Sequence, residues 1–351
     1  SFTTGNGRNT AVGKGSMYTT TTGYQNTAVG SDSMRSNTTG YMNTTVGETS
    51  MHNNTTGIEN AFFGYAAGHG NTTASSNTFI GGYSGNVNTT GANNTGCGHN
   101  TLRANTTGAD NVAIGSSALD ANTTASNNTA IGRNALGANT VGHSNVAIGR
   151  DALYTSVGET QCVAVGYYAL RLSNNGRCVG IGHSAGVNIS TGFNNTVVGN
   201  QVAGTLTTGD NNIAIGYDAD VPSANSNNTC TFGNGSIDNL RCNDTSISSL
   251  SDERDKTNIE DLALGVDFLN TVRPVSFDWD RRDGTFAGYK SLGFIAQELK
   301  VAGDATDFAD HMRLVHNDNP DKLEADPMKM FPVLVKAIQE LSAKVKALEE
   351  A

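Results

Sequence analysis

The stretch Asn111-Val112-Ala113-Ile114-Gly115 decides the fold, because near-copies of it recur along most of the chain. The closing glycine returns every 17 residues through ten copies, one step of 16 follows, and the 17-residue step then resumes. A register held over fourteen units is typical of a solenoid whose repeats stack on their neighbours. The closing glycines are Gly13, Gly30, Gly47, Gly64, Gly81, Gly98, Gly115, Gly132, Gly149, Gly166, Gly182, Gly199, Gly216 and Gly233.

Apolar and small residues alternate before each closing glycine, as in a β-strand. Val or Ile precedes the glycine, and Thr or Val lies two places before that residue. Because alternate strand residues share a face, we expect these two columns to form the core, with Cys97 among them. The small residue between them, usually alanine, would then face outward and allow another surface to approach closely.

A second apolar column follows four residues after the closing glycine and would supply the other half of a thin core. A second glycine, ten residues after the first, usually follows two threonines, and we expect it to adopt positive φ in a tight reversal. Each repeat is thus predicted to hold two short strands and two turns. At a strand spacing of ~4.8 Å the stack would be roughly 65 Å long. An asparagine column, four residues before the closing glycine, predicts an amide ladder between coils: Asn9, Asn26, Asn43, Asn60, Asn77, Asn94, Asn111, Asn128, Asn145, Asn195 and Asn212.

Bulk composition limits the possible functions. With 42 glycines and 15% charged residues, the chain does not read as one ordinary globular core. A net charge of −10 gives nucleic acid no basic footprint. No apolar run approaches the ~20 residues of a membrane span, and the first 15 residues lack the pattern of a signal peptide. The five cysteines have no metal-ligand spacing, so we expect no metal site. We also expect no cofactor and no membrane insertion.

The chain divides near residue 250. Residues 1–250 carry 12 acidic and 9 basic side chains, whereas the shorter remainder carries 20 and 13. We predict a β-solenoid shaft over 1–236, a connector over 237–250 and a small α+β domain over 251–351.

The repeats resemble the head repeats of trimeric autotransporter adhesins, with Asn145-Val146-Ala147-Ile148-Gly149 among the nearest strings. Similar repeats are common in phage tail fibres. The resemblance implies a mainly β fold, a trimeric parallel β-solenoid (β-roll). A single thin solenoid would also be only marginally stable, because one coil buries few side chains, and packing against other copies would stabilise it. We therefore expect a homotrimer packed along the alanine row.

The residues from Ser251 to Ile259 read as a polar loop by themselves. The string Ser-Asp-Glu-Arg-Asp-Lys-Thr-Asn-Ile nevertheless resembles the opening of the self-cleaving intramolecular chaperones that end endosialidases and other phage tail spikes and fibres. A predicted helix over 261–271, a strand over 273–279 and a strand running into a helix over 292–299 agree with that family. The resemblance therefore implies an intramolecular chaperone over 251–351.

That resemblance also implies a site. Ser251 would be the nucleophile that attacks the carbonyl of Leu250, and Lys256 would be the general base, so the chain would cut itself between Leu250 and Ser251. A lysine serves as a base only when its pKa is lowered by burial or by like charge. Closure of a trimer around Lys256 would supply that burial, and cutting would then depend on correct assembly. The chain would act as a serine peptidase on itself alone.

The last segment, 327–350, is predicted to be a helix with an apolar a/d seam. Such a seam favours a parallel trimeric coiled coil, and the alternative is an amphipathic helix packed on its own domain. The seam residues are Phe331, Leu334, Ile338, Leu341, Val345 and Leu348.

Together these features predict a tail-fibre adhesin of the virion tail, made in the host cytoplasm and binding a glycan or protein receptor on the host surface. A bacterial surface adhesin fragment and a polysaccharide-degrading tail spike are the alternatives. A spike needs a carboxylate pair about 5–10 Å apart, and the 12 shaft acids form no recurring pair. An ice-binding array is disfavoured because the paired threonines are adjacent, so they face opposite ways. Aromatic residues of the early repeats would line a sugar-binding surface or pack in the core and turns: Tyr18, Tyr24, Tyr41, Phe62, Phe79 and Tyr83.

Overall fold

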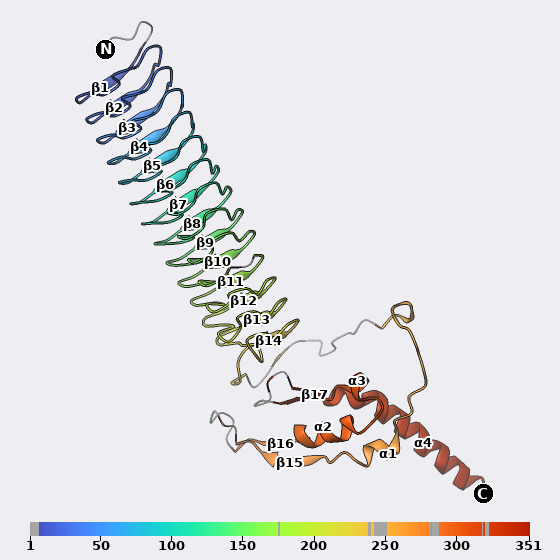
Figure 1. Cartoon of the computed structure of the whole chain (residues 1–351). Helices are drawn as coiled ribbons and strands as arrows, with labels where there is room; N and C mark the ends of the chain where they lie inside the picture. The colour runs from blue at the N-terminus through green and yellow to red at the C-terminus, as the bar shows by residue number, and fades with distance from the viewer. Residues whose placement is uncertain are drawn as a thin grey trace. The chain divides into compact units, whose positions relative to one another are not determined.

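The computed structural model describes residues 7–174, 176–237, 240–241, 251–280, 282, 288–317, 319 and 323–351. Its contacts divide the chain into two compact units, Ser1–Asn234 and Gly235–Ala351. Figure 1 shows the first unit as a stack of coils and the second as a small group of helices and short strands.

The first unit is a parallel β-solenoid, as predicted. Fourteen strands pair in chain order in one sheet, and equivalent repeat positions lie opposite each other, as Ala113 does to Ala130 (Figure 1). The strands are β1 Thr10–Val12, β2 Thr27–Val29, β3 Thr44–Val46, β4 Ala61–Phe63, β5 Thr78–Ile80, β6 Thr95–Cys97, β7 Val112–Ile114, β8 Thr129–Ile131, β9 Val146–Ile148, β10 Val163–Val165, β11 Val179–Ile181, β12 Thr196–Val198, β13 Ile213–Ile215 and β14 Cys230–Phe232.

The core lies on the face of the strands opposite to the one predicted. In β7 the middle residue, Ala113, is fully buried, whereas Ile114 is 39% exposed. Cys97, predicted to be a core thiol, is exposed. The coil interior has room for one small side chain beside each Leu or Met. Where Phe62 takes the middle position, a Cβ on Gly68 would lie 2.1 Å from its ring, so a large residue in one column is matched by glycine in the other.

Each coil contains one strand, and the predicted second strand is absent from the described coils. The second apolar column is buried as expected, but its residues lie in turns with left-handed backbone, as Leu119 does at φ 51°. The two glycine columns also differ from expectation. The closing glycine has positive φ, 116° at Gly115. The second glycine does not need it; a Cβ on Gly108 would lie 2.3 Å from the carbonyl oxygen of Ala125 in the next coil.

The predicted asparagine ladder is confirmed. The N–H of Asn128 donates to Oδ1 of Asn111 at 3.0 Å, and Nδ2 of Asn111 donates to the carbonyl of Ala125 at 2.9 Å. A second ladder was not predicted, although the Asn-Thr-Thr-Gly strings contain it. Nδ2 of Asn122 donates to Oδ1 of Asn105 at 2.7 Å, one coil earlier. The ladders satisfy buried amides along the stack, which a thin coil has few other means to do.

The second unit packs short elements around one small core. They are the 3-10 turn η1 Glu253–Asp255, α1 Val266–Leu269, β15 Val275–Asp278, β16 Lys290–Gly293, α2 Ala296–Asp304, α3 Ala309–Met312, β17 Val315–His316, β18 Glu324–Ala325, the 3-10 turn η2 Pro327–Met330 and α4 Phe331–Glu349. β15 pairs antiparallel with β16, and β17 with β18. The core residues are Phe268, Leu299, Met312, Leu314, Met330 and Val333.

The helix predicted over 261–271 is limited to the four residues of α1. Gly265 precedes it with φ −139° and ψ −130°, outside the helical region, and so no helix continues through it from residue 264. A residue far along the sequence caps the first turn of α1: Oε2 of Glu340 on α4 accepts the N–H of Val266 at 3.0 Å. A Cβ on Gly265 would lie 2.3 Å from the same carboxylate, so glycine allows α4 to approach.

Candidate functional site

Ser251 and Lys256 lie on either side of η1 and meet across it. Asp252 caps the turn by accepting the N–H of Arg254 at 2.9 Å, and the N–H of Lys256 donates to the carbonyl of Glu253 at 3.1 Å. This tight turn reverses the chain within five residues. The Nζ of Lys256 thereby lies 2.6 Å from Oγ of Ser251.

The neighbouring acid, Asp252, forms an ion pair with Arg254 and so is not engaged by Lys256. Nε and a terminal nitrogen of Arg254 donate to the two oxygens of Asp252 at 2.9 and 2.6 Å. These side-chain hydrogen bonds, and then the backbone one, hold the pKa of Asp252 below its usual value. A carboxylate engaged on both oxygens leaves Lys256 to bond Ser251, which is the arrangement that a hydroxyl–amine pair needs.

Both predicted catalytic residues are exposed in the single chain. A general base must be neutral, and burial is what favours the neutral form of an amine. The predicted bond partner, Leu250, lies outside the described residues. What the single chain provides is a hydroxyl and an amine at hydrogen-bonding distance.

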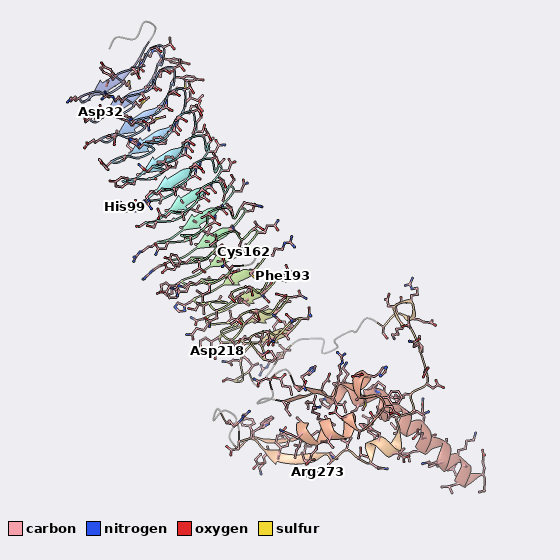
Figure 2. All side chains as sticks on the ribbon, viewed as in Figure 1. Asp32, His99, Cys162, Phe193, Asp218 and Arg273 are labelled. Atoms are coloured by element: carbon pink, nitrogen blue, oxygen red, sulfur yellow. The ribbon has the colours of Figure 1, made fainter. Side chains whose placement is uncertain are left out.

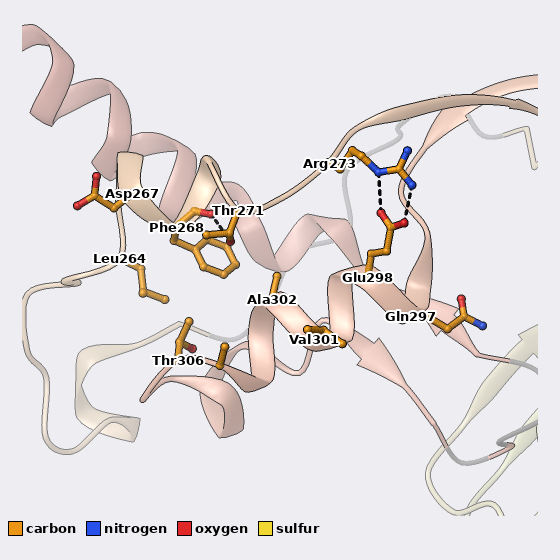
Figure 3. Close-up of a pocket in the computed structure, with 11 residues that line it drawn as sticks. Leu264, Asp267, Phe268, Thr271, Arg273, Gln297, Glu298, Val301, Ala302 and Thr306 are labelled. Atoms are coloured by element: carbon orange, nitrogen blue, oxygen red, sulfur yellow. Dashed lines mark hydrogen bonds and ion pairs between the residues drawn. The ribbon is translucent and has the colours of Figure 1, made fainter.

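A groove of the second unit is a separate feature. It has a volume of about 860 Å³ and lies between α1 and α2, with Phe268, Val301 and Ala302 among its lining residues (Figure 3). At its edge Nε of Arg273 donates to Oε2 of Glu298 at 2.9 Å, and this pair lowers the pKa of Glu298. Neither Ser251 nor Lys256 lines the groove, so it is not the predicted site.

The aromatic residues of the early repeats divide into two groups. Phe62 and Phe79 are fully buried and stack at 4.9 Å, so they belong to the core. Tyr24 and Tyr41 stack in parallel at 4.8 Å, and Tyr24 is exposed. Stacked rings at the surface are compatible with the predicted sugar-binding role but do not define a site.

Within the described part of the chain, no three His, Cys, Asp or Glu side chains gather as metal ligands would. The helices among those same residues are too short or too polar to cross a membrane. Of the cysteines, Cys162 and Cys178 are buried, Cys230 is exposed, and Cys242 lies outside the described residues.

Comparison with known proteins places one similarity on the second unit. Residues 251–312 match the family described as the chaperone of endosialidase. No curated protein and no solved structure gives a significant match. The C-terminal unit is therefore similar to an endosialidase chaperone, and the matched region begins at Ser251 itself.

Proposed function

We propose that this chain is a subunit of a homotrimeric fibre of the phage-tail type, in which residues 251–351 direct trimer assembly and then release themselves by cutting between Leu250 and Ser251. The observation that carries the proposal is the 2.6 Å contact between Nζ of Lys256 and Oγ of Ser251. It falls in the first six residues of the region that matches the chaperone of endosialidase.

The chemistry uses only these two side chains, the peptide bond and water. Neutral Lys256 takes the proton of the Ser251 hydroxyl as Oγ attacks the carbonyl carbon of Leu250. The C–O bond forms, the C–N bond breaks, and Lys256 returns the proton to the amide nitrogen, which becomes a free amine. Water then hydrolyses the ester, leaving a carboxylate on Leu250 and restoring the hydroxyl of Ser251.

An exposed apolar stripe along the shaft supports the trimer. The residue before each closing glycine faces outward, and nine members of this column are 37 to 59% exposed. A continuous apolar row of this length favours contact with another chain. Three shafts packed along a common axis would bury it. This stripe takes the role that was predicted for the alanine row, which lies inside the coil. Its members are Val12, Val46, Phe63, Ile80, Ile114, Ile148, Ile181, Ile215 and Phe232.

Helix α4 supports the same assembly. Val333 and Ala337 are buried against their own unit, whereas Leu334, Ile338 and Leu341 on the a/d seam are 44 to 66% exposed. The amphipathic-helix alternative would require the seam itself to pack on the unit. Because α4 packs on its own unit through the face that carries Val333 and Ala337, the seam remains exposed and available for a parallel coiled coil.

Assembly would also switch on cutting. In a closed trimer the surrounding protein would displace water from Lys256 and favour its neutral form. Cleavage would then report that three chains have assembled. The released shaft would belong to the virion tail, made in the host cytoplasm, and would bind a glycan or protein receptor on the host surface.

The test is a denaturing gel with intact-mass analysis of freshly expressed protein. The wild-type chain should give fragments 1–250 and 251–351, whereas Ser251→Ala and Lys256→Ala should each give one uncut chain. Thr257→Ala, an exposed change in the same segment, serves as the control and should be cut normally. Cutting that persists in either test variant contradicts the pair, and a wild-type monomer by light scattering contradicts the trimer.

A further inference from the structure

Both asparagine ladders change at the same level of the shaft: the first is interrupted and resumes at Asn195, and the second ends at Asn139. The first ladder passes from Asn145 to Cys162 and Cys178, and the second has Ser156 and Ser173 where asparagine is usual. The one 16-residue step between closing glycines falls here too. We refer to the coils from Ser156 to Cys178 as the ladder break. Figure 2 labels Cys162 within the shaft.

Glu159 brings a carboxyl group into the interior at the ladder break. It occupies the second-glycine column, where an added Cβ points at the second ladder; on Gly40 it would lie 2.4 Å from Oδ1 of Asn37 and 2.7 Å from Nδ2 of Asn54. Glu159 is 4% exposed. Among the described residues, neither of its oxygens nor Oγ of Ser156 has a hydrogen-bond partner. The small serine and cysteine side chains leave room for it.

Among the residues that the structure describes, no cation lies close enough to Glu159 to offset a charge on it. The thiols of Cys162 and Cys178 flank it, and burial raises the pKa of Cys162 to about 12, so that thiol stays neutral. In the described neighbouring coils, His143 and Arg177 are exposed.

The other charged neighbours do not supply a partner either. The guanidinium of Arg171 lies over the ring of Tyr168 at 4.7 Å, and Asp210 would add charge of the same sign on the side of Cys178. An ionised carboxylate would therefore be buried without compensation, which is unfavourable.

We propose that Glu159 makes the ladder break a proton-controlled weak point of the shaft: the coils are closed while its carboxyl group is neutral and open when it ionises. Burial raises the pKa of Glu159 from its ordinary 4.5 to about 7 in the folded chain. Between these values the folded state holds a proton that the open state has lost. Stability of these coils therefore falls as pH rises from about 4.5 towards 7, and the loss is complete above the folded value.

Thiol labelling tests this directly, because opening would expose Cys162 and Cys178. The full-length protein is treated with N-ethylmaleimide at pH 5.5 and pH 8, and the modified cysteines are located by peptide mass mapping. Comparing variants at the same pH cancels the intrinsic reactivity of a thiol. At pH 8 the wild type should label these two cysteines on the order of a hundredfold faster than Glu159→Gln, and this ratio should fall to about tenfold at pH 5.5.

Two further variants keep the result interpretable. Glu59→Gln removes the same charge from an exposed shaft position and should behave as the wild type. Glu159→Gly restores the residue that most repeats carry and should also lose the pH dependence, even if the glutamine variant folds poorly. Equal labelling of wild type and both Glu159 variants at pH 8 would overturn the proposal. The readout does not depend on cutting at Ser251, so the two ideas fail separately.

Discussion

Lys256 reaches Ser251 across a single 3-10 turn, with its Nζ 2.6 Å from the hydroxyl oxygen. If this contact only stabilised the turn, another long cation would preserve it. If Lys256 acts as a base, it must become neutral, and a guanidinium cannot do so in a protein. We therefore expect Lys256→Arg to leave the chain uncut while trimer assembly, measured by sedimentation, is unchanged. Normal cutting in this variant would show that the lysine has a structural role alone.

The closing glycines should be far less tolerant of substitution than a shaft glycine with open space around it, such as Gly204. Gly132 has φ 131°, and a Cβ there would lie 2.6 Å from the carbonyl carbon of Gly149. Gly132→Ala should cost roughly 2 kcal/mol or more per chain from backbone strain alone. On Gly204 the nearest atom to an added Cβ is 3.6 Å away, so Gly204→Ala should change stability by less than about 0.5 kcal/mol. Thermal unfolding followed by circular dichroism compares the two, and similar midpoints would contradict this account.

A ladder asparagine should matter more for stability than a surface side chain of a neighbouring coil. Asn111→Ala would leave the buried N–H of Asn128 without its partner and would remove one of the two side-chain hydrogen bonds that the carbonyl of Ala125 accepts. Each unsatisfied buried group costs about 1–3 kcal/mol, so we expect a clear fall in denaturation midpoint. Thr124→Ala changes an exposed position in the next repeat and should have little effect. An Asn111→Ala protein as stable as the threonine variant would show that the ladder contributes little.

The exposed stripe should control assembly more than folding of the single coil. Ile114→Asp places a charge in the stripe, whereas Val141→Asp places the same charge on an exposed valine outside the strands. Burying an unpaired carboxylate between chains is unfavourable, so Ile114→Asp should shift the trimer towards monomer in sedimentation equilibrium, and Val141→Asp should not. An intact trimer in both variants would mean that the shafts meet elsewhere.

The fold was largely predictable because a repeat of fixed length leaves few ways to stack. The strand positions, the parallel order and the first ladder all follow from the spacing of Gly115 and Asn111 in their columns. The face of each strand was not predictable from alternation alone. A period of two says that Ala113 and Ile114 point opposite ways, but both faces carry residues that a core could accept.

The candidate site was predictable only in its residues. A serine five places before a lysine is common in polar loops, and it was the resemblance of the string around Ser251 that selected the pair. The capping of η1 by Asp252 and the ion pair with Arg254 came from the folded turn, because they depend on how the backbone reverses.

The sequence by itself determined the repeat, its length and its parallel stacking, since a 17-residue register admits one neighbour for each coil. Only the tertiary structure decided which column is core. The interior of a single coil is too narrow for both Ile114 and Leu119, so the alanine column turned inward and the isoleucine column was left on the surface. Which column turns inward depends on the volume enclosed by each coil, and the residue pattern alone does not predict that volume. It also moves the proposed contact between chains from the alanine row to the exposed stripe.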